Sequence, residues 1–144
     1  MTVRRILKHK SGDGVFTVPP GTKVSDAVAM LAEKRIGTVI VSEDGRRAMG
    51  ILSERDVVRH LAKDGPSVLD RPVDELMTRR LETCPIDERA DQVLARMTEG
   101  RFRHMPVVDG EEMIALISLG DVVKMRLDEV RAERDALEDM VMGR

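Results

Sequence analysis

Two pairs of residues in this sequence have the types and the spacing to do chemistry: Ser53 with Asp56, and Ser118 with Asp121. In each pair a serine is followed three residues later by an aspartate, at the predicted start of a helix. The unpaired N–H groups and partial positive charge of a helix N-terminus attract phosphate, and the serine hydroxyl adds a donor. The aspartate, one turn into the helix, can accept charge-assisted hydrogen bonds from ribose hydroxyls. The pattern therefore fits a ribose phosphate.

The same spacing also has a purely structural interpretation. Ser-x-x-Asp is a loose form of the capping box, in which the two side chains satisfy backbone N–H groups without any ligand. Two cations close to the pairs, Arg55 and Lys124, are likewise open to two interpretations. They reach a bound phosphate, or they are solvated on helix surfaces. The residues by themselves leave these alternatives open.

Both pairs lie within a segment that the chain contains twice. Residues 50–58, GILSERDVV, return as ALISLGDVV at residues 115–123, so that the two aspartates are 65 positions apart. Thr17-Val18-Pro19 likewise returns as Thr83-Cys84-Pro85. An internal repeat determines the architecture before any local prediction is made. We therefore expect two copies of one unit, followed by a tail, and we expect each candidate site to occur twice.

Each copy is predicted to fold as strand, helix, strand, strand, helix. In the first copy, a short strand at 15–18 precedes a helix that Thr22 caps and that ends near Gly37. The β-branched run 38–41 predicts a buried strand, and the next strand, 48–52, leads into the helix that carries the first serine–aspartate pair. The second copy follows the same order.

The sequence predicts three segments: 1–66 as repeat one with an N-terminal segment, 67–126 as repeat two with the linker, and 127–144 as a C-terminal helical extension. The extension continues the last helix with apolar residues at alternating steps of four and three, which is the spacing of a heptad seam. Such a short seam favours docking on a partner subunit over a free coiled coil. Its members are Val123, Leu127, Val130, Arg134, Leu137 and Val141, with Arg134 as the charged break.

Composition excludes several classes of protein. Of the 144 residues, 42% are hydrophobic and 35% are charged, as in soluble globular domains, and no apolar run approaches the ~18 residues that a membrane span needs. A net charge of −2, with no Trp or Tyr, argues against binding nucleic acid. Cys84 is the single cysteine and is interpreted as inert packing. With no secretion signal, these features predict a cytoplasmic protein.

Little in the chain suggests catalysis. The three histidines, His9, His60 and His104, are scattered and have no cysteine partner, which argues against a zinc site. Neither serine of the two pairs has a histidine–acid arrangement to activate it. We therefore expect no catalytic residues, no metal and no catalytic cofactor.

With the repeat established, the sequence resembles the CBS domain, and the tandem resembles a Bateman module, as in small bacterial proteins that consist of a CBS pair alone. The signature is a small residue, two apolar residues, Ser or Thr, two variable positions, Asp and an apolar residue. Copy one matches it fully from Gly50 to Val57, whereas copy two has Ala115 where glycine is usual. The resemblance covers roughly residues 10–126. Supporting matches are VSDA at 24–27, ELMT at 75–78 and RHMPVV at 103–108.

The resemblance implies an α/β (α+β) fold of two β-α-β-β-α units, related by a pseudo-twofold axis, with their sheets packed together. Such pairs usually assemble further, so a homodimer is expected. The clefts between the copies bind adenosine-containing ligands in this family: AMP, ADP, ATP, S-adenosylmethionine or NAD. The usual role is regulatory signalling toward another protein.

The resemblance also implies which residues form two sites, named site A and site B. In the family, the Ser/Thr-x-x-Asp of one copy is joined by the first strand and the start of the second strand of the other copy. Arg55 and Lys124 remain candidates for phosphate contacts. Carried over to this sequence, site A comprises Ser53, Asp56, Thr83, Arg103, His104 and Pro106, and site B comprises Ser118, Asp121, Thr17, Val18, Gly37 and Thr38.

The two sites are expected to be unequal. Arg103 and His104 in site A can both donate to phosphate, whereas Gly37 and Thr38 in site B carry no charge. Gly50 is also expected to leave room for the chain to approach a ligand closely. Its counterpart in copy two, Ala115, adds a methyl group at that position. Site A should therefore hold the more phosphorylated ligand, or the same ligand more tightly and with more salt dependence. Site B is expected to be empty or to prefer a less charged adenosine compound.

We interpret the chain as a cytoplasmic, non-catalytic regulatory module that binds an adenosine ligand between its repeats and acts in trans on an unidentified effector protein. No membrane or nucleic acid partner is expected. The alternative is a dimeric interaction scaffold with vestigial nucleotide sites. An enzyme acting on a nucleotide is disfavoured because no base–nucleophile pair is present.

Overall fold

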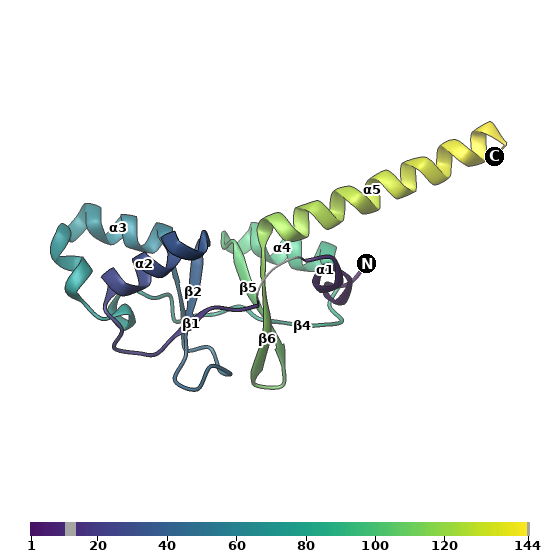
Figure 1. Cartoon of the computed structure of the whole chain (residues 1–144). Helices are drawn as coiled ribbons and strands as arrows, with labels where there is room; N and C mark the ends of the chain where they lie inside the picture. Colours follow the sequence, from purple (N-terminus) through teal and green to yellow (C-terminus); the bar gives the residue numbers. More distant parts are fainter. Residues whose placement is uncertain (11–13, 144) are drawn as a thin grey trace. The chain divides into compact units, whose positions relative to one another are not determined.

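The computed structural model describes residues 1–10 and 14–143, and it confirms the predicted mixed fold of two β-α-β-β-α repeats (Figure 1). A helix, α1 (Val3–His9), precedes the repeats, and two 3₁₀ helices, η1 (Pro66–Asp70) and η2 (Val73–Glu75), connect them. The first repeat consists of β1 (Thr17–Val18), α2 (Val24–Lys34), β2 (Thr38–Val41), β3 (Gly50–Ser53) and α3 (Glu54–Asp64). The second consists of β4 (Cys84–Pro85), α4 (Ala90–Gly100), β5 (His104–Asp109), β6 (Glu112–Ser118) and α5 (Leu119–Met142).

Each repeat forms its own three-stranded sheet, ordered β1-β2-β3 in the first and β4-β5-β6 in the second. The first strand is parallel to the second: Thr17 pairs with Ile40 in one sheet, and Cys84 pairs with Val107 in the other. β2 and β3 are antiparallel. The middle strand β2 is buried along its whole length, which explains why its sequence is continuously β-branched instead of alternating.

The chain divides into two compact units, each built mainly from one repeat. At two places a segment belongs to the unit of the other repeat. The first-repeat unit holds residues 14–82 together with the hairpin tip Gly110–Ile114. The second-repeat unit holds residues 1–10, Thr83–Asp109 and 115–143. The N-terminal segment, grouped with repeat one on the basis of sequence order, therefore belongs to the second-repeat unit.

Burial and backbone pairing explain why α1 packs on the later repeat. Val3 and Ile6 lie in the hydrophobic core of the second-repeat unit. The N–H of Val3 donates to the carbonyl oxygen of Glu88 at 2.9 Å, and the N–H of Arg4 donates to that of Ile86 at 2.8 Å. The hairpin tip is held in the first-repeat unit in a similar way. There the N–H of Met113 donates to the Arg46 carbonyl oxygen at 2.7 Å.

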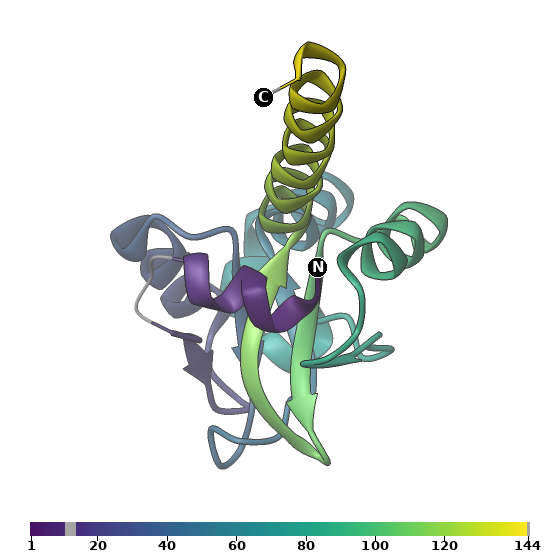
Figure 2. The ribbon, with the colours of Figure 1, turned by 90° about the vertical axis from the view of Figure 1, so that its right-hand side faces the viewer.

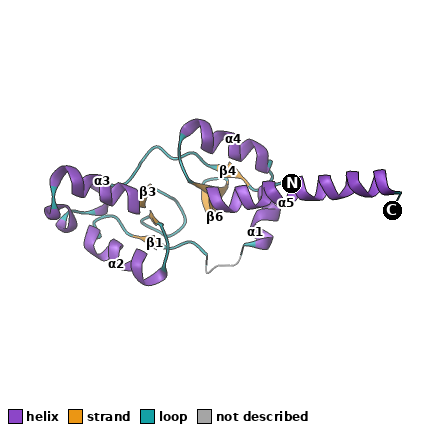
Figure 3. Cartoon of the chain, turned by 90° about the horizontal axis from the view of Figure 1, so that it is seen from above, coloured by secondary structure: helices purple, strands orange, loops and turns teal. Residues whose placement is uncertain are grey.

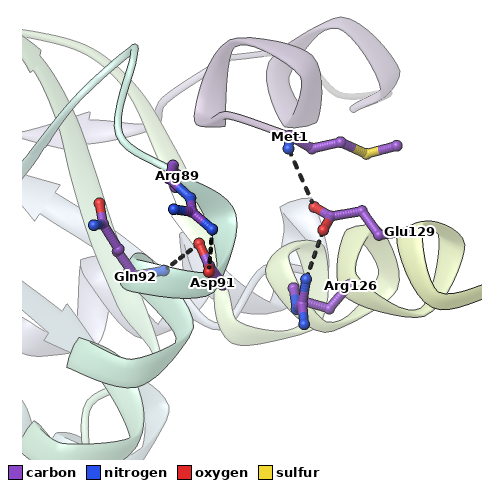
Figure 4. A network of polar contacts seen from close by, with 6 residues as sticks. All are labelled: Met1, Arg89, Asp91, Gln92, Arg126 and Glu129. Atoms are coloured by element: carbon purple, nitrogen blue, oxygen red, sulfur yellow. Dashed lines mark hydrogen bonds and ion pairs between the residues drawn. The ribbon is translucent and has the colours of Figure 1, made fainter. Parts of the chain in front are cut away.

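Polar contacts fix the start of α4 and the approach of α1 to α5 (Figure 4). Arg89 pairs with Asp91 at 2.8 Å where α4 begins. The amino group of Met1 lies 3.6 Å from Glu129 Oε1, and Arg126 donates to the other oxygen of that carboxylate at 2.6 Å. Glu129 is also the last residue of α5 that is not exposed, so the packing of this helix on its unit ends there.

The N-terminus of α2 differs by one residue from the prediction. Thr22 was expected to cap the helix, but the N-cap position is Lys23, which makes no side-chain capping bond. The hydroxyl of Thr22 instead donates to the carbonyl oxygen of Pro19 at 2.7 Å, within the preceding turn.

The C-terminus of α2 also differs from the prediction, because the helix ends before Gly37. Arg35 adopts the left-handed conformation that ends it, with φ of 55°, and Arg101 ends α4 in the same way, with φ of 56°. Left-handed backbone is unfavourable for residues with a Cβ atom, and glycine is the usual residue at this position. Both repeats therefore hold an arginine in a costly conformation.

Replacing Arg35 with glycine is expected to raise the free energy of unfolding by about 0.5–1 kcal/mol, because it relieves this left-handed strain. The matched control is Lys34→Gly, one residue earlier inside α2, which should lower it by about 0.5–1 kcal/mol. Urea unfolding followed by circular dichroism measures both. Destabilisation by both substitutions would contradict the assignment of strain to Arg35.

Candidate functional site

Ser53 and Asp56 form a complete capping box at the start of α3, as one of the two interpretations predicted. Ser53 Oγ accepts from the N–H of Asp56 at 3.2 Å. Asp56 Oδ2 accepts from the N–H of Ser53 at 3.0 Å and from its hydroxyl at 2.9 Å, and Arg59 donates to Oδ1 at 2.6 Å. A carboxylate has about four acceptor positions. Three donors therefore leave Asp56 room for about one more.

Ser118 and Asp121 form the same box at the start of α5. Ser118 Oγ accepts from the N–H of Asp121 at 3.1 Å, and Asp121 Oδ2 accepts from the N–H of Ser118 at 2.8 Å. The charged donor from outside the capping box is different here. Lys10, which follows α1, donates to Asp121 Oδ2 and to the carbonyl oxygen of Leu116, both at 2.7 Å.

The two carboxylates consequently differ in accessibility. The side chain of Asp56 is 8% exposed, whereas that of Asp121 is 26% exposed. Among the described residues, the hydrogen-bond donors to Asp121 all reach Oδ2. Asp121 Oδ1 is thus more available to a ligand than either carboxylate oxygen of Asp56.

The surroundings of Asp121 and His104 lower the pKa of both side chains. Burial raises the pKa of Asp121, but the hydrogen bonds from Lys10 and Ser118 outweigh burial and lower it overall, so the carboxylate is ionised at neutral pH. The pKa of His104 is lowered by burial first, and then by the charges of Lys10 and Arg103, while Asp121 opposes the shift. His104 is therefore neutral at pH 7, and it can donate one N–H but carries no charge to offer a phosphate.

The helix N-termini offer fewer free N–H groups than the sequence led us to expect. In α3 the first N–H, from Glu54, donates to the carbonyl oxygen of Gly37 at 3.0 Å. In α5 the equivalent N–H, from Leu119, donates to the carbonyl oxygen of Arg103 at 2.7 Å. The third N–H of each helix is taken by its capping serine. The starts of the two helices therefore leave few backbone donors for a phosphate.

These same bonds show which predicted residues the structure brings together. Within the first-repeat unit, Gly37 and Thr38 at the start of β2 lie next to the start of α3. Within the second-repeat unit, Arg103 and His104 lie next to the start of α5. Sites A and B exchange these strand residues between the repeats, and that exchange stays a prediction.

The remaining predicted site residues differ in what their side chains can contribute. Val18 and Thr38 are 4% and 6% exposed, and Pro106 is also buried, so these three can contribute only limited surface or backbone atoms. The carbonyl oxygen of Val18 already accepts from the N–H of Ser42 at 2.9 Å. Exposed residues are Arg55, Thr83, Arg103 and Lys124, and partly exposed ones are Thr17, Gly37, Ser53, His104 and Ser118.

The space beside Gly50 is filled by the protein itself, which corrects the expectation that it leaves room for a ligand. A Cβ atom at this position would lie 2.5 Å from Met77 Sδ and 3.0 Å from the carbonyl oxygen of Thr78. The N–H of Ile51 donates to that same carbonyl oxygen at 3.0 Å. Gly50 therefore allows the chain after η2 to pair with β3.

Two residues at the serine–aspartate pairs were missed from the sequence. Arg59 follows Asp56 by three positions on one helix, and this spacing of opposite charges was a readable signal. Lys10 gave no such signal, because it reaches Asp121 only after α1 packs on the second-repeat unit.

Residues 1–10 and 14–143 contain no group of three or more His, Cys, Asp or Glu side chains placed to hold a metal ion. Within these same residues, no helix is long and apolar enough to cross a membrane. Cys84 is fully buried, and burial, followed by the charge of Glu88 and opposed by Arg96, raises its pKa to about 11. Its thiol therefore stays protonated, in accord with a packing role.

Two repeats of this kind, each with a serine–aspartate cap after its third strand, define a tandem α+β module. The model of the CBS domain matches residues 3–63 and 73–128. The chain therefore belongs to the CBS domain family and contains two CBS domains.

Comparison with individual proteins gives the same result. The mitochondrial CBS domain-containing protein CBSX3 of Arabidopsis thaliana is 31% identical, over 94% of this chain and 68% of that protein. This chain spans only 24% of the length of another relative from that plant, CBSCBSPB1. The solved structure of the CBS-domain containing protein ATU1752 from Agrobacterium tumefaciens is 36% identical, with a TM-score of 0.82 over 88% of this chain and 99% of that chain. CBSX2, solved in complex with AMP, is 26% identical, with a TM-score of 0.72 over 88% of this chain and 96% of that chain.

The lowered pKa of His104 predicts a pH dependence of stability. The unfolded side chain has an ordinary pKa of about 6.5, so as pH falls through this value the unfolded state binds the proton first and the folded state loses stability. His104→Gln cannot titrate and should lose less stability than the wild type between pH 7.5 and 5.5, by up to about 1.4 kcal/mol per pH unit. Urea unfolding at both pH values measures the difference. Parallel pH profiles for the two proteins would contradict the prediction.

Proposed function

We propose that this chain is a non-catalytic regulatory module that binds an adenosine-containing ligand at two sites and acts on an effector protein in trans, in the cytoplasm. The observation that carries the proposal is the duplicated Ser-x-x-Asp, with each carboxylate beside the start of a strand that offers further polar groups. Membership of the CBS family and the AMP complex of CBSX2 support an adenosine ligand such as AMP, ADP, ATP or NAD.

We assign roles by chemistry. Each aspartate accepts hydrogen bonds from ribose hydroxyls, which the charge of the carboxylate strengthens. Asp121 Oδ1 is open to both hydroxyls, whereas Asp56 has room for about one. Because most N–H groups of the helix starts are occupied, phosphate oxygens depend on exposed cations, of which Arg103 is the first candidate and Arg55 and Lys124 are the others. Sites A and B retain the composition that the resemblance implies, with the buried residues contributing mainly backbone atoms.

The first test concerns the carboxylates. Asp56→Asn and Asp121→Asn should each weaken AMP binding at one site by about 1.5–3 kcal/mol, because an amide replaces a charged acceptor. Binding of 2′-deoxy-AMP should be weaker in the wild type and should fall less on substitution, because one of the two donors is absent. Titration calorimetry on nucleotide-free protein measures both ligands.

The control for these variants is Asp44→Asn. Asp44 also caps backbone N–H groups, those of Arg46 and Arg47, which lower its pKa to about 2, but it lies outside both sites. Its substitution should leave AMP affinity unchanged. If the two site variants bind AMP and 2′-deoxy-AMP as tightly as this control, the two aspartates serve only as helix caps.

A second test uses the contact between Lys10 and Asp121. The ammonium group occupies Asp121 Oδ2 and leaves only Oδ1 for the two ribose hydroxyls, so Lys10→Met should strengthen binding of uncharged adenosine at site B by about 1 kcal/mol. The gain should be smaller for AMP, since the same substitution removes a cation near the phosphate. Lys8→Met, two residues earlier and within α1, is the matched control and should change neither affinity. Weaker adenosine binding by the Lys10 variant would show that this lysine belongs to the site.

One observation favours the interaction scaffold as a second candidate. Both capping boxes are complete without a ligand, and Asp56 is nearly saturated with donors. The sequence offers a direct way to separate the two functions, because a chain without Trp or Tyr absorbs little at 280 nm. Adenine that co-purifies with the protein would dominate the spectrum near 260 nm. No adenine in the purified protein, and no calorimetric heat with any adenosine ligand, would favour the scaffold.

A further inference from the structure

The C-terminal part of α5 carries an apolar stripe that its own unit does not cover. In Figures 2 and 3 the helix continues alone beyond α1 and α4, and from residue 130 onward every described residue is exposed. Val130, Leu137 and Val141 are 51%, 61% and 85% exposed. An isolated helix of this length is marginal in water, and most helical stability comes from packing an apolar face. The stripe therefore needs a covering surface.

The charges beside the stripe identify that surface. In heptad terms, Leu127, Arg134 and Val141 occupy the a positions, and Val130 and Leu137 occupy d positions. The flanking g positions hold Arg126, Glu133 and Met140, and the e positions hold Arg131 and Glu138. These flanking residues set the orientation in which a second helix can pair.

Parallel pairing of two copies of α5 would place like charges together at every level. A g position then faces the e position five residues later in the second copy. Arg126 would face Arg131, Glu133 would face Glu138, and Arg134 would face its own counterpart within the seam. Each of these contacts is repulsive, so the sequence of this helix disfavours a parallel pair.

Antiparallel pairing removes these conflicts. In the register that uses only the exposed end of the helix, Val130 faces Val141 of the second copy and Arg134 faces Leu137. Arg131 then lies beside Glu138 of the second copy, and the twofold symmetry gives this opposite-charge contact twice. The stem of Arg134 can pack along the seam while its charged end stays with Asp135 and Glu138 of its own helix, 3.2 Å and 4.0 Å away.

We propose that the exposed end of α5 is a self-association surface, which pairs with the same segment of a second copy of this chain in an antiparallel register centred between Arg134 and Leu137. The proposal specifies the interface and orientation of the homodimer that the sequence led us to expect. It does not depend on the nucleotide sites.

Charge reversal in the full-length protein tests the register, with the association constant measured by sedimentation equilibrium. Arg131→Glu should weaken association at least tenfold, because it places a new carboxylate beside Glu138 of the second copy at both symmetry-related contacts. Glu138→Arg should do the same, and the double variant R131E/E138R should restore association to near the wild-type value. Asp139→Arg, on the opposite side of the helix, is the control and should have little effect.

The direction of the change separates the alternatives. In a parallel pair, Arg131→Glu would bring the new carboxylate beside Arg126 and strengthen association, which would overturn the proposal. Unchanged association in both single variants would also overturn it, since this face of α5 would then not be the interface. Circular dichroism confirms that each variant keeps its helix content.

Cross-linking gives a second readout that other contacts between copies do not affect. Val130→Cys and Val141→Cys are prepared separately and oxidised alone or mixed, with wild-type protein, whose only cysteine is the buried Cys84, as the background. The antiparallel register predicts a covalent dimer in the mixture and much less in either variant alone. Cross-linking within each variant alone, or none in the mixture, would overturn the register.

Discussion

The reciprocal hydrogen bonding of serine and aspartate at the strand-to-helix corner is the interaction on which the rest of each repeat depends. It begins the last helix of the repeat, and the first N–H of that helix returns to the carbonyl oxygen before the middle strand. The corner thus fixes where the helix begins and, at the same time, orients a carboxylate. The aspartate therefore caps the helix and is also the proposed ligand for ribose. Its presence in the sequence does not show which of these two roles it serves.

The two corners have diverged in the charged side chain that donates to each carboxylate from outside the capping box. Asp56 takes Arg59 from its own helix, so its environment is local and nearly closed. Asp121 takes Lys10 from a segment at the other end of the chain, and it keeps greater exposure. The asymmetry that the sequence suggested in favour of site A, from Arg103 and His104, is therefore joined by a second asymmetry, of opposite direction, in the accessibility of the carboxylates.

Local patterns were sufficient to predict the repeat, the order of its elements and both capping boxes, because these depend on residues close together in sequence. The departures come from contacts between distant segments or from backbone geometry. Nothing near Arg35 indicated that an arginine would accept the left-handed position, and Gly50 could be interpreted only once Thr78 was seen to pair beside it. Lys10 required knowing that α1 packs on the later repeat. The pairing of site residues across the repeats rests on the family resemblance.

The interleaving of the chain between its two units constrains how the protein is made. Val3 and Ile6 are synthesised before most of the core that buries them, which includes Cys84, Met105 and Met125. The hairpin tip Gly110–Ile114, synthesised late, belongs to the unit whose other residues come first. Neither unit is therefore a consecutive stretch of the chain, and a cut at the linker between the repeats would separate each unit from residues that pack in it.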